Sequence, residues 1–171
     1  MLESLFVNTD IEVVDTSILY YRGQRNAKTL VNEQFNGKLS DDKFSAPPDL
    51  LLVRNWNLDN KNHQVTYLAA FEIKSPCSKE RVHGKEIQNY HVRVKREMNA
   101  HLSVHDKVIL TDCHRWQFFQ KPSRWLPLEK MTPEATIEFF KEADQNLQEP
   151  EEWKELQDTI LGLVGLKRAA R

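Results

Sequence analysis

The sequence predicts an α/β fold in which a sheet is flanked by helices. Apolar runs at 50–53 and 65–73 are separated by turn-forming residues, and the runs at 107–111 and 116–120 repeat this arrangement. Before, between and after these pairs, apolar side chains recur at the spacing of amphipathic helices. The alternation of extended and helical segments within 171 residues favours a single domain spanning 1–171.

The first half of the chain is predicted to supply a strand, a helix and a hairpin. Residues 10–20 are rich in β-branched side chains and indicate a strand or an extended lead-in. Apolar side chains spaced four apart predict a short amphipathic helix over 26–38. The proline pair at 47–48 then forces an extended backbone. Residues 49–74 are expected to form a long β-hairpin that turns near Asn60.

A long helix is predicted from about 79 to 101, with Ser78 as its N-cap. Its expected apolar stripe consists of Ile87, Tyr90, Val94 and Met98. Beyond it, 107–111 and 116–120 are expected to be paired strands joined by a turn at 112–114.

The C-terminal part is expected to be a helical extension over about 131–168. Thr132 and Pro133 suit the cap and the first position of a helix. A last helix is expected after Pro150, with Trp153, Leu156, Ile160, Leu163 and Val164 on its apolar side. This acidic extension either packs on the core or forms a dimer face, and periodicity does not choose between the two.

The composition is that of a globular protein, with 40% hydrophobic and 29% charged residues. It excludes wholesale disorder, and the longest apolar runs are far shorter than the ~20 residues of a membrane span. The N-terminal residues lack the regions of a signal peptide, and Cys77 and Cys113 do not form a C-x-x-C pair. We therefore expect an intracellular protein without a membrane partner, cytoplasmic or, in a eukaryote, nuclear.

Charge is unevenly distributed, although the formal net charge is only −1. Residues 79–107 hold seven basic and four acidic residues, whereas 129–158 hold three basic and ten acidic ones. Such runs are commonly solvated helix faces, but a basic middle also favours an anionic ligand there. The candidates for phosphate contacts, which follow closely on the 49–74 hairpin, are Lys79, Arg81, Lys85, Arg93 and Arg96.

The predicted hairpin brings three charged residues together. Asp49 heads its first strand, and Glu72 and Lys74 end its second, two residues apart and therefore on one face. Antiparallel pairing about a turn near Asn60 places Asp49 beside Glu72. Two carboxylates and an ammonium on a sheet face need a metal, a ligand or water around them. Hard oxygen ligands suit Mg²⁺ or Mn²⁺.

The string Pro48-Asp49, apolar strand, turn, apolar strand, Glu72-Ile73-Lys74 resembles the PD-(D/E)xK nuclease superfamily. The resemblance covers roughly residues 26–120. It implies a restriction-endonuclease-like αβββαβ core, with a central mixed sheet flanked by helices.

Two branches of the superfamily are similar to this chain. Residues 71–76, 84–90 and 108–112 resemble the N-terminal nuclease domain of type I restriction R subunits. Ser75-Pro76, with basic and tyrosine residues on the following predicted helix, resembles the Uma-type endonuclease family. The chain departs from the first branch in the two-residue spacing of Gln88 and Tyr90 and in having Asp112-Cys113 where Asn-Gly is expected.

The resemblance implies roles for particular residues. Those implied to act in catalysis are Asp49, Glu72, Lys74 and Gln88. Those implied to hold Mg²⁺ or Mn²⁺ are Asp49, Glu72, the backbone carbonyl of Ile73 and, from the first helix, Glu33. Glu12 and Glu3 are alternatives to Glu33. Lys74 would position the attacking water.

The sequence therefore predicts a metal-dependent nuclease that hydrolyses phosphodiester bonds in nucleic acid, with DNA as the favoured substrate. Two alternatives stay open: a nuclease fold retained as a binding module for nucleic acid or protein, and an RNA endonuclease. A homodimer or a larger complex is the expected source of any sequence specificity. The six histidines show no zinc-site spacing and are expected to be solvated.

Overall fold

The computed structural model describes residues 2–16, 37–38, 45–46, 48–56, 65–74, 81–82, 85–86, 90–122, 132–139 and 151–167. At 37–38, 45–46, 81–82, 85–86 and 90–92 it describes the backbone only.

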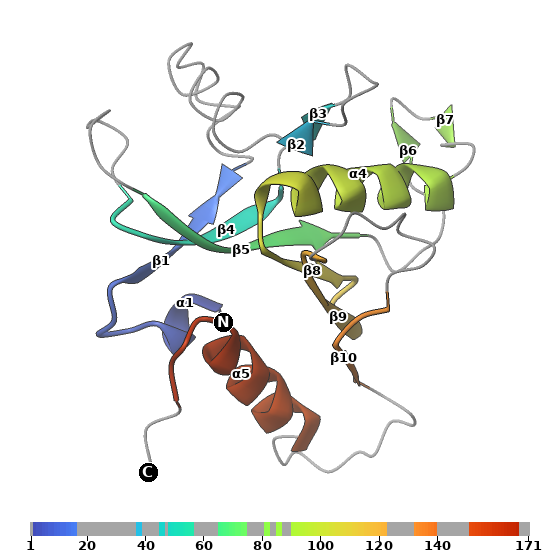
Figure 1. Ribbon diagram of the computed structural model, residues 1–171. Coiled ribbons are helices and arrows are strands. Elements are labelled where there is room, and N and C mark those ends of the chain that lie inside the picture. Colours follow the sequence, from blue (N-terminus) through green and yellow to red (C-terminus); the bar gives the residue numbers. More distant parts are fainter. Residues whose placement is uncertain are drawn as a thin grey trace.

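A mixed sheet of six strands forms the centre of the described part (Figure 1). In spatial order the strands are β1 (Ile11–Asp15), β4 (Leu50–Arg54), β5 (Thr66–Ile73), β8 (Lys107–Thr111), β9 (Arg115–Gln120) and β10 (Ala135–Glu138). Neighbours are antiparallel except β5 and β8, which are parallel. Two short antiparallel pairs lie outside this sheet: β2 (Gly37–Lys38) with β3 (Ser45–Ala46), and β6 (Arg81–Val82) with β7 (Lys85–Glu86).

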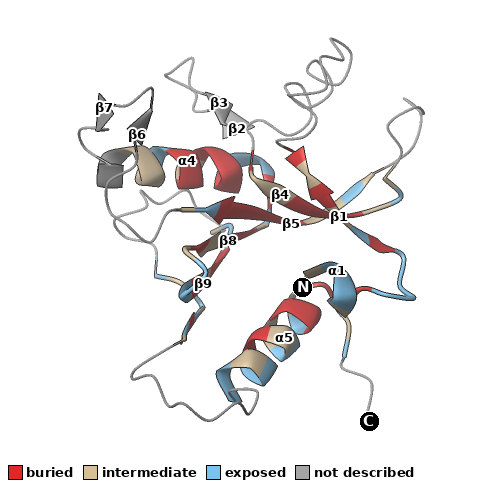
Figure 2. Cartoon of the chain, turned by 180° about the vertical axis from the view of Figure 1, so that it is seen from behind, coloured by how far each residue is buried: buried red, intermediate tan, exposed pale blue. Residues whose placement is uncertain are grey.

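Helices lie on both faces of the sheet, so the described part has three layers. Helix α4 (Tyr90–Val104) connects β5 to β8 and covers one face, while α1 (Leu2–Leu5) and α5 (Glu151–Leu163) lie on the other (Figure 1). The central strands β4, β5 and β8 are largely buried between the layers (Figure 2). Parallel strands joined through a helix need both sheet faces covered, which this arrangement provides.

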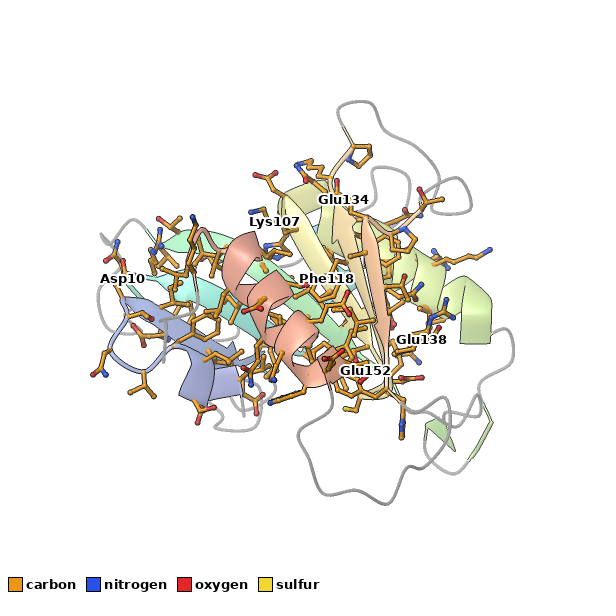
Figure 3. The ribbon with its side chains drawn as sticks, turned by 90° about the horizontal axis from the view of Figure 1, so that it is seen from below. Asp10, Lys107, Phe118, Glu134, Glu138 and Glu152 are labelled. Carbon is orange, nitrogen blue, oxygen red and sulfur yellow. The ribbon has the colours of Figure 1, made fainter. Side chains whose placement is uncertain are left out.

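Alternation along the strands divides the core in two. On the α4 side, Leu51, Val53 and Ala70 pack with Met98 and other side chains of the helix. On the α5 side, the main members are Leu52, Phe71, Ile109, Phe118, Leu156 and Ile160. Figure 3 views this second layer, with α5 lying across the sheet and Phe118 beneath it.

The expected mixed α/β architecture is confirmed, and so are most of its central elements. The hairpin over 49–74 is present as β4 and β5, with Leu50 opposite Phe71. The strand pair at 107–111 and 116–120 is present as β8 and β9. The helix expected after Pro150 is present as α5.

The predicted helix over 79–101 is wrong in its first part. Residues 81–82 and 85–86 form strands, and α4 runs from Tyr90 to Val104. A β-branched valine at 82 and a glycine at 84 have low helix propensity, which outweighs the capping signal of Ser78.

The helix predicted at Thr132 and Pro133 is also wrong, because residues 135–138 form the edge strand β10. Pairing with β9 outweighs the local cap signal, and a proline before the first residue of an edge strand removes no ladder hydrogen bond. Of the helix predicted over 26–38, residues 37–38 form β2, and the rest lies outside the described residues.

Candidate active site

Asp49 is held in place by the backbones of two flanking segments. Its N–H donates to the carbonyl of Phe71 at 2.9 Å, and its carbonyl accepts from the N–H of Thr16 at 3.1 Å. The buried Thr16 hydroxyl also donates to the carbonyl of Pro48. The Asp49 side chain turns toward the end of β5, where Oδ2 accepts from the N–H of Ile73 at 2.6 Å. The expectation that Asp49 lies beside the end of the second hairpin strand is confirmed.

Glu72 and Lys74 stand at the carboxyl end of β5, which lies between β4 and β8. Glu72 is only 4% exposed, and its Oε1 forms an ion pair with the Lys74 ammonium. The N–H of Lys74 donates to the carbonyl of Thr111 at 2.7 Å, so β8 fixes its backbone. Both side chains, like Asp49, are on the α4 face, because they share the alternation that directs Leu51 and Ala70 into that layer.

Helix α4 adds three side chains to this group, spaced four residues apart. His101 is fully buried, and its Nε2 lies 2.8 Å from Oε2 of Glu72. Glu97 is 5% exposed; its Oε2 lies 2.6 Å from the Lys74 ammonium, and its Oε1 accepts from Nε of Arg93 at 2.8 Å. The charges therefore alternate along a chain from Arg93 through Glu97 and Lys74 to Glu72, whose other oxygen faces the His101 ring. The expectation of solvated histidines is wrong for His101 and for His105, which is 3% exposed.

The charge of Asp49 is opposed by its surroundings. Burial raises the pKa of Asp49 from 3.8 to about 6, and the nearby carboxylate of Glu72 acts in the same direction. The hydrogen bond from Ile73 and the positive charges of Lys74 and His101 offset only part of this effect. A bound cation would stabilise the ionised form of Asp49, as expected for a carboxylate in a cation site.

Glu72 and Lys74 keep their charges. Burial alone would raise the pKa of Glu72, but the hydrogen bond from His101 and the charges of His101 and Lys74 outweigh it, so the pKa is lowered. Burial alone would lower the pKa of Lys74, but the carboxylates of Glu72 and Glu97 hold it above its ordinary value. Lys74 is therefore an ammonium ion at neutral pH.

The donors fit a divalent cation only in part. Within the described residues, no group of three or more His, Cys, Asp or Glu side chains is arranged to hold a metal ion. Asp49 and Glu72 offer two hard oxygen donors at adjacent strand ends, and a backbone carbonyl, water and substrate oxygens would have to complete the shell. Mg²⁺ commonly binds through one or two carboxylates in this way.

The other predicted site residues have different outcomes. Gln88, Glu33 and Lys79 lie outside the described residues. Arg81 and Lys85 are in β6 and β7, so they do not share a helix with Arg93 and Arg96 as expected. Arg93 pairs with Glu97, and Arg96 is exposed on α4. Of the alternatives to Glu33, Glu12 is exposed on β1, and Glu3 is exposed in α1 on the opposite side of the sheet.

A cavity of about 540 Å³ lies on the α5 side of the sheet. Its walls are mainly apolar and include Val13, Phe71, Trp116 and Trp153. Ile73 also lines it, because this residue points away from the face that carries its neighbours Glu72 and Lys74. The sheet therefore separates this cavity from the charged group.

The sequence held a signal for the missed residues of α4. Val94, Met98 and Leu102 form an apolar line at four-residue spacing, and all three pack in the α4-side core. Arg93, Glu97 and His101 repeat this spacing one residue earlier, which places them along the flank of the buried stripe. Polar residues repeating beside a core stripe indicate a partner on the element that the helix covers.

Comparison with protein-family models, curated proteins and solved structures returned no match to this chain. None of the described helices combines the length and apolar character that crossing a bilayer requires.

Proposed function

We propose that the chain is a metal-dependent nuclease that hydrolyses phosphodiester bonds in nucleic acid, with DNA as the favoured substrate. The observation that carries the proposal is the convergence of Asp49, Glu72 and Lys74 on one face at the ends of β4 and β5. The succession of β4, β5, α4 and β8 supports it, because the ββαβ part of an αβββαβ core has this order.

Asp49 and Glu72 would hold Mg²⁺ or Mn²⁺ through carboxylate oxygens, together with the backbone carbonyl of Ile73. When bound, the divalent ion polarises a phosphoryl oxygen and lowers the pKa of a coordinated water. Lys74 would orient the attacking water and stabilise negative charge that develops on the phosphate. It does not act as a general base, because the two carboxylates around it keep it protonated.

The test is cleavage of labelled single- and double-stranded DNA and RNA with Mn²⁺, Mg²⁺ or EDTA. Cutting should require the metal, and Lys74→Ala should reduce it at least about a hundredfold. The matched control is Lys154→Ala, the same substitution at an exposed lysine of α5, which should cut normally. Equal cutting by the Lys74→Ala variant would refute the assigned role, and a preference for RNA substrates would identify an RNA endonuclease.

A second candidate is a nuclease fold that binds nucleic acid or protein without cutting. It is favoured by the side-chain pairs that already engage Glu72, Lys74 and Glu97, and by the lack of a three-ligand metal group among the described residues. Retention of labelled nucleic acid by the folded protein, with no cutting under either metal, would support this candidate over the enzyme.

A further inference from the structure

Helix α4 and strand β5 present two pairs of side chains with matching spacing. Glu97 and His101 are four residues apart on the helix, which corresponds to an advance of about 6 Å. Glu72 and Lys74 are two residues apart on or just after the strand, or about 6.6 Å. A helix that connects two parallel strands runs opposite to them, as α4 does in Figure 1. The earlier helix residue therefore meets the later strand residue.

The contacts follow this antiparallel match. Glu97 contacts Lys74 at 2.6 Å, and His101 contacts Glu72 at 2.8 Å. The oxygens of Glu72 are divided between two partners: Oε2 faces His101, and Oε1 faces Lys74. Oε1 of Glu72 pairs with the Lys74 ammonium, as a carboxylate does, so Oε2 accepts and Nε2 of His101 carries the hydrogen. Glu72 and Lys74 thus each have one partner on α4, His101 for Glu72 and Glu97 for Lys74.

Stability alone does not account for these partners. Buried ion pairs are often no more stabilising than apolar residues of the same volume, because desolvation offsets the attraction. His101 is fully buried, and its Nδ1 has no hydrogen-bond partner within the described part of the chain, which adds a further cost. Apolar residues in place of both Glu72 and His101, next to core residues Met98 and Leu102, would avoid both costs.

We propose that Glu97 and His101 are positioning residues for the reaction. His101 fixes the rotation of the Glu72 carboxylate and so determines which oxygen is presented on the side of Asp49. Glu97 draws the Lys74 ammonium toward α4 and so determines where that charge stands relative to the substrate phosphate. This inference rests on the proposed nuclease function and assigns to α4 the alignment of Glu72 in β5 and of Lys74 directly after it.

The test compares His101→Leu, His101→Gln and Glu97→Gln with the wild-type chain. The matched control is His105→Leu, the same substitution four residues further along the chain, directly after the end of α4. His105 is a buried histidine whose ring packs against Tyr67 with centroids 5.9 Å apart. The measurements are the dissociation constant for Mn²⁺, kcat and KM on labelled DNA, and the NMR signal of the Lys74 ammonium protons. Ion pairing slows the exchange of these protons with water and makes them observable.

Each variant has its own expected result. His101→Leu should weaken Mn²⁺ binding at least about tenfold, and His101→Gln, which keeps a donor near the position of Nε2, should restore most of it. Glu97→Gln should lower kcat about tenfold or more, with little change in KM or Mn²⁺ affinity, and should weaken the Lys74 ammonium signal, because only the ion pair with Glu72 remains. His105→Leu should lower stability without any of these effects.

The outcomes separate this inference from the proposed function. If the wild-type chain cuts and both His101→Leu and Glu97→Gln behave like His105→Leu, the positioning roles are overturned and the nuclease stands. If the wild-type chain binds Mn²⁺ without cutting, the nuclease falls. In that case the effect of His101→Leu on Mn²⁺ affinity still tests the role of His101. The effect of Glu97→Gln on the Lys74 ammonium signal still tests the role of Glu97. If it neither binds Mn²⁺ nor cuts, both proposals fall.

Discussion

The ionised carboxylate of Asp49 lowers the stability of the folded state. Its backbone is fixed by hydrogen bonds to Thr16 and Phe71, so its carboxylate cannot leave the partly buried end of the sheet. There the neighbouring carboxylate of Glu72 and the loss of solvent oppose its charge. A position selected only for folding would hold a neutral side chain, whereas a cation site needs this carboxylate ionised.

We expect Asp49→Asn to stabilise the metal-free protein at pH 7. The folded pKa of about 6 lies above the ordinary value of 3.8, so the folded state holds its proton more tightly than the unfolded state. Stability therefore falls as the pH rises from about 4 to about 6, and the full cost is present above that window. Removing the charge of Asp49 should raise the free energy of unfolding by on the order of 1 kcal/mol, discounted for partial exposure.

The measurement is urea unfolding of both proteins in EDTA at pH 4 and pH 7. The gain should be present at pH 7 and much smaller at pH 4, because the folded carboxyl is then protonated and the unfolded one is only about half ionised. The amide that Asp49→Asn introduces retains an oxygen that accepts from the N–H of Ile73, so the comparison isolates the charge. A gain of the same size at both pH values would mean that charge is not its cause.

At the scale of elements, α5 is held to the sheet by its apolar stripe. Leu156 and Ile160 are fully buried against the α5-side core, while Glu151, Glu152, Lys154 and Glu155 face solvent. The Lys107 ammonium also donates to the carbonyl of Leu163 and so ties the end of the helix to β8. Of the two arrangements that periodicity left open for this helix, packing on the core is the one observed.

Two substitutions in α5 should therefore change stability in opposite directions. Ile160→Ala removes a fully buried side chain and should cost about 2–5 kcal/mol of unfolding free energy. Gly162→Ala should add about 0.5–1 kcal/mol, because Gly162 is helical and a Cβ there meets nothing within 4 Å. Thermal and urea unfolding measure both effects. A destabilising Gly162→Ala would show that this part of α5 is not helical in solution.

At the scale of the whole molecule, the sheet separates two apolar layers that share no side chains. The charged group belongs to the α4 layer, and the cavity of about 540 Å³ belongs to the α5 layer. This division follows from strand alternation, because the side chains of consecutive residues such as Glu72 and Ile73 point to opposite faces of the sheet.

Stability changes in the two layers should therefore add. Leu102→Ala, on the α4 side, and Ile160→Val, on the α5 side, should combine to within about 0.5 kcal/mol of the sum of their separate effects. A pair within one layer, Leu156→Ala with Ile160→Val, serves as the comparison and should deviate more. Urea unfolding of the single and double variants measures the coupling. A coupling above about 1 kcal/mol across the sheet would contradict independent layers.

The sequence by itself determined the central hairpin and the position of Asp49 relative to Glu72 and Lys74. Those predictions rest on local rules: alternation along strands, turn-forming residues, and the fixed register of an antiparallel pair. The boundaries of β8, β9 and α5 were predictable for the same reason. Local rules failed at 81–82, 85–86 and 135–138. Capping signals predicted helices there, but these residues pair as strands.

Only the tertiary structure decided which residues surround the three charged ones. Glu97 and His101 lie more than twenty residues beyond Lys74 in the chain and reach β5 because the helix between the parallel strands folds back over the sheet. Their spacing on α4 was visible in the sequence, but the element that they face depends on the crossover. The pKa of Asp49 and the lasting charge of Lys74 depend on the same packing, because burial and neighbouring charges arise only when α4 covers the sheet.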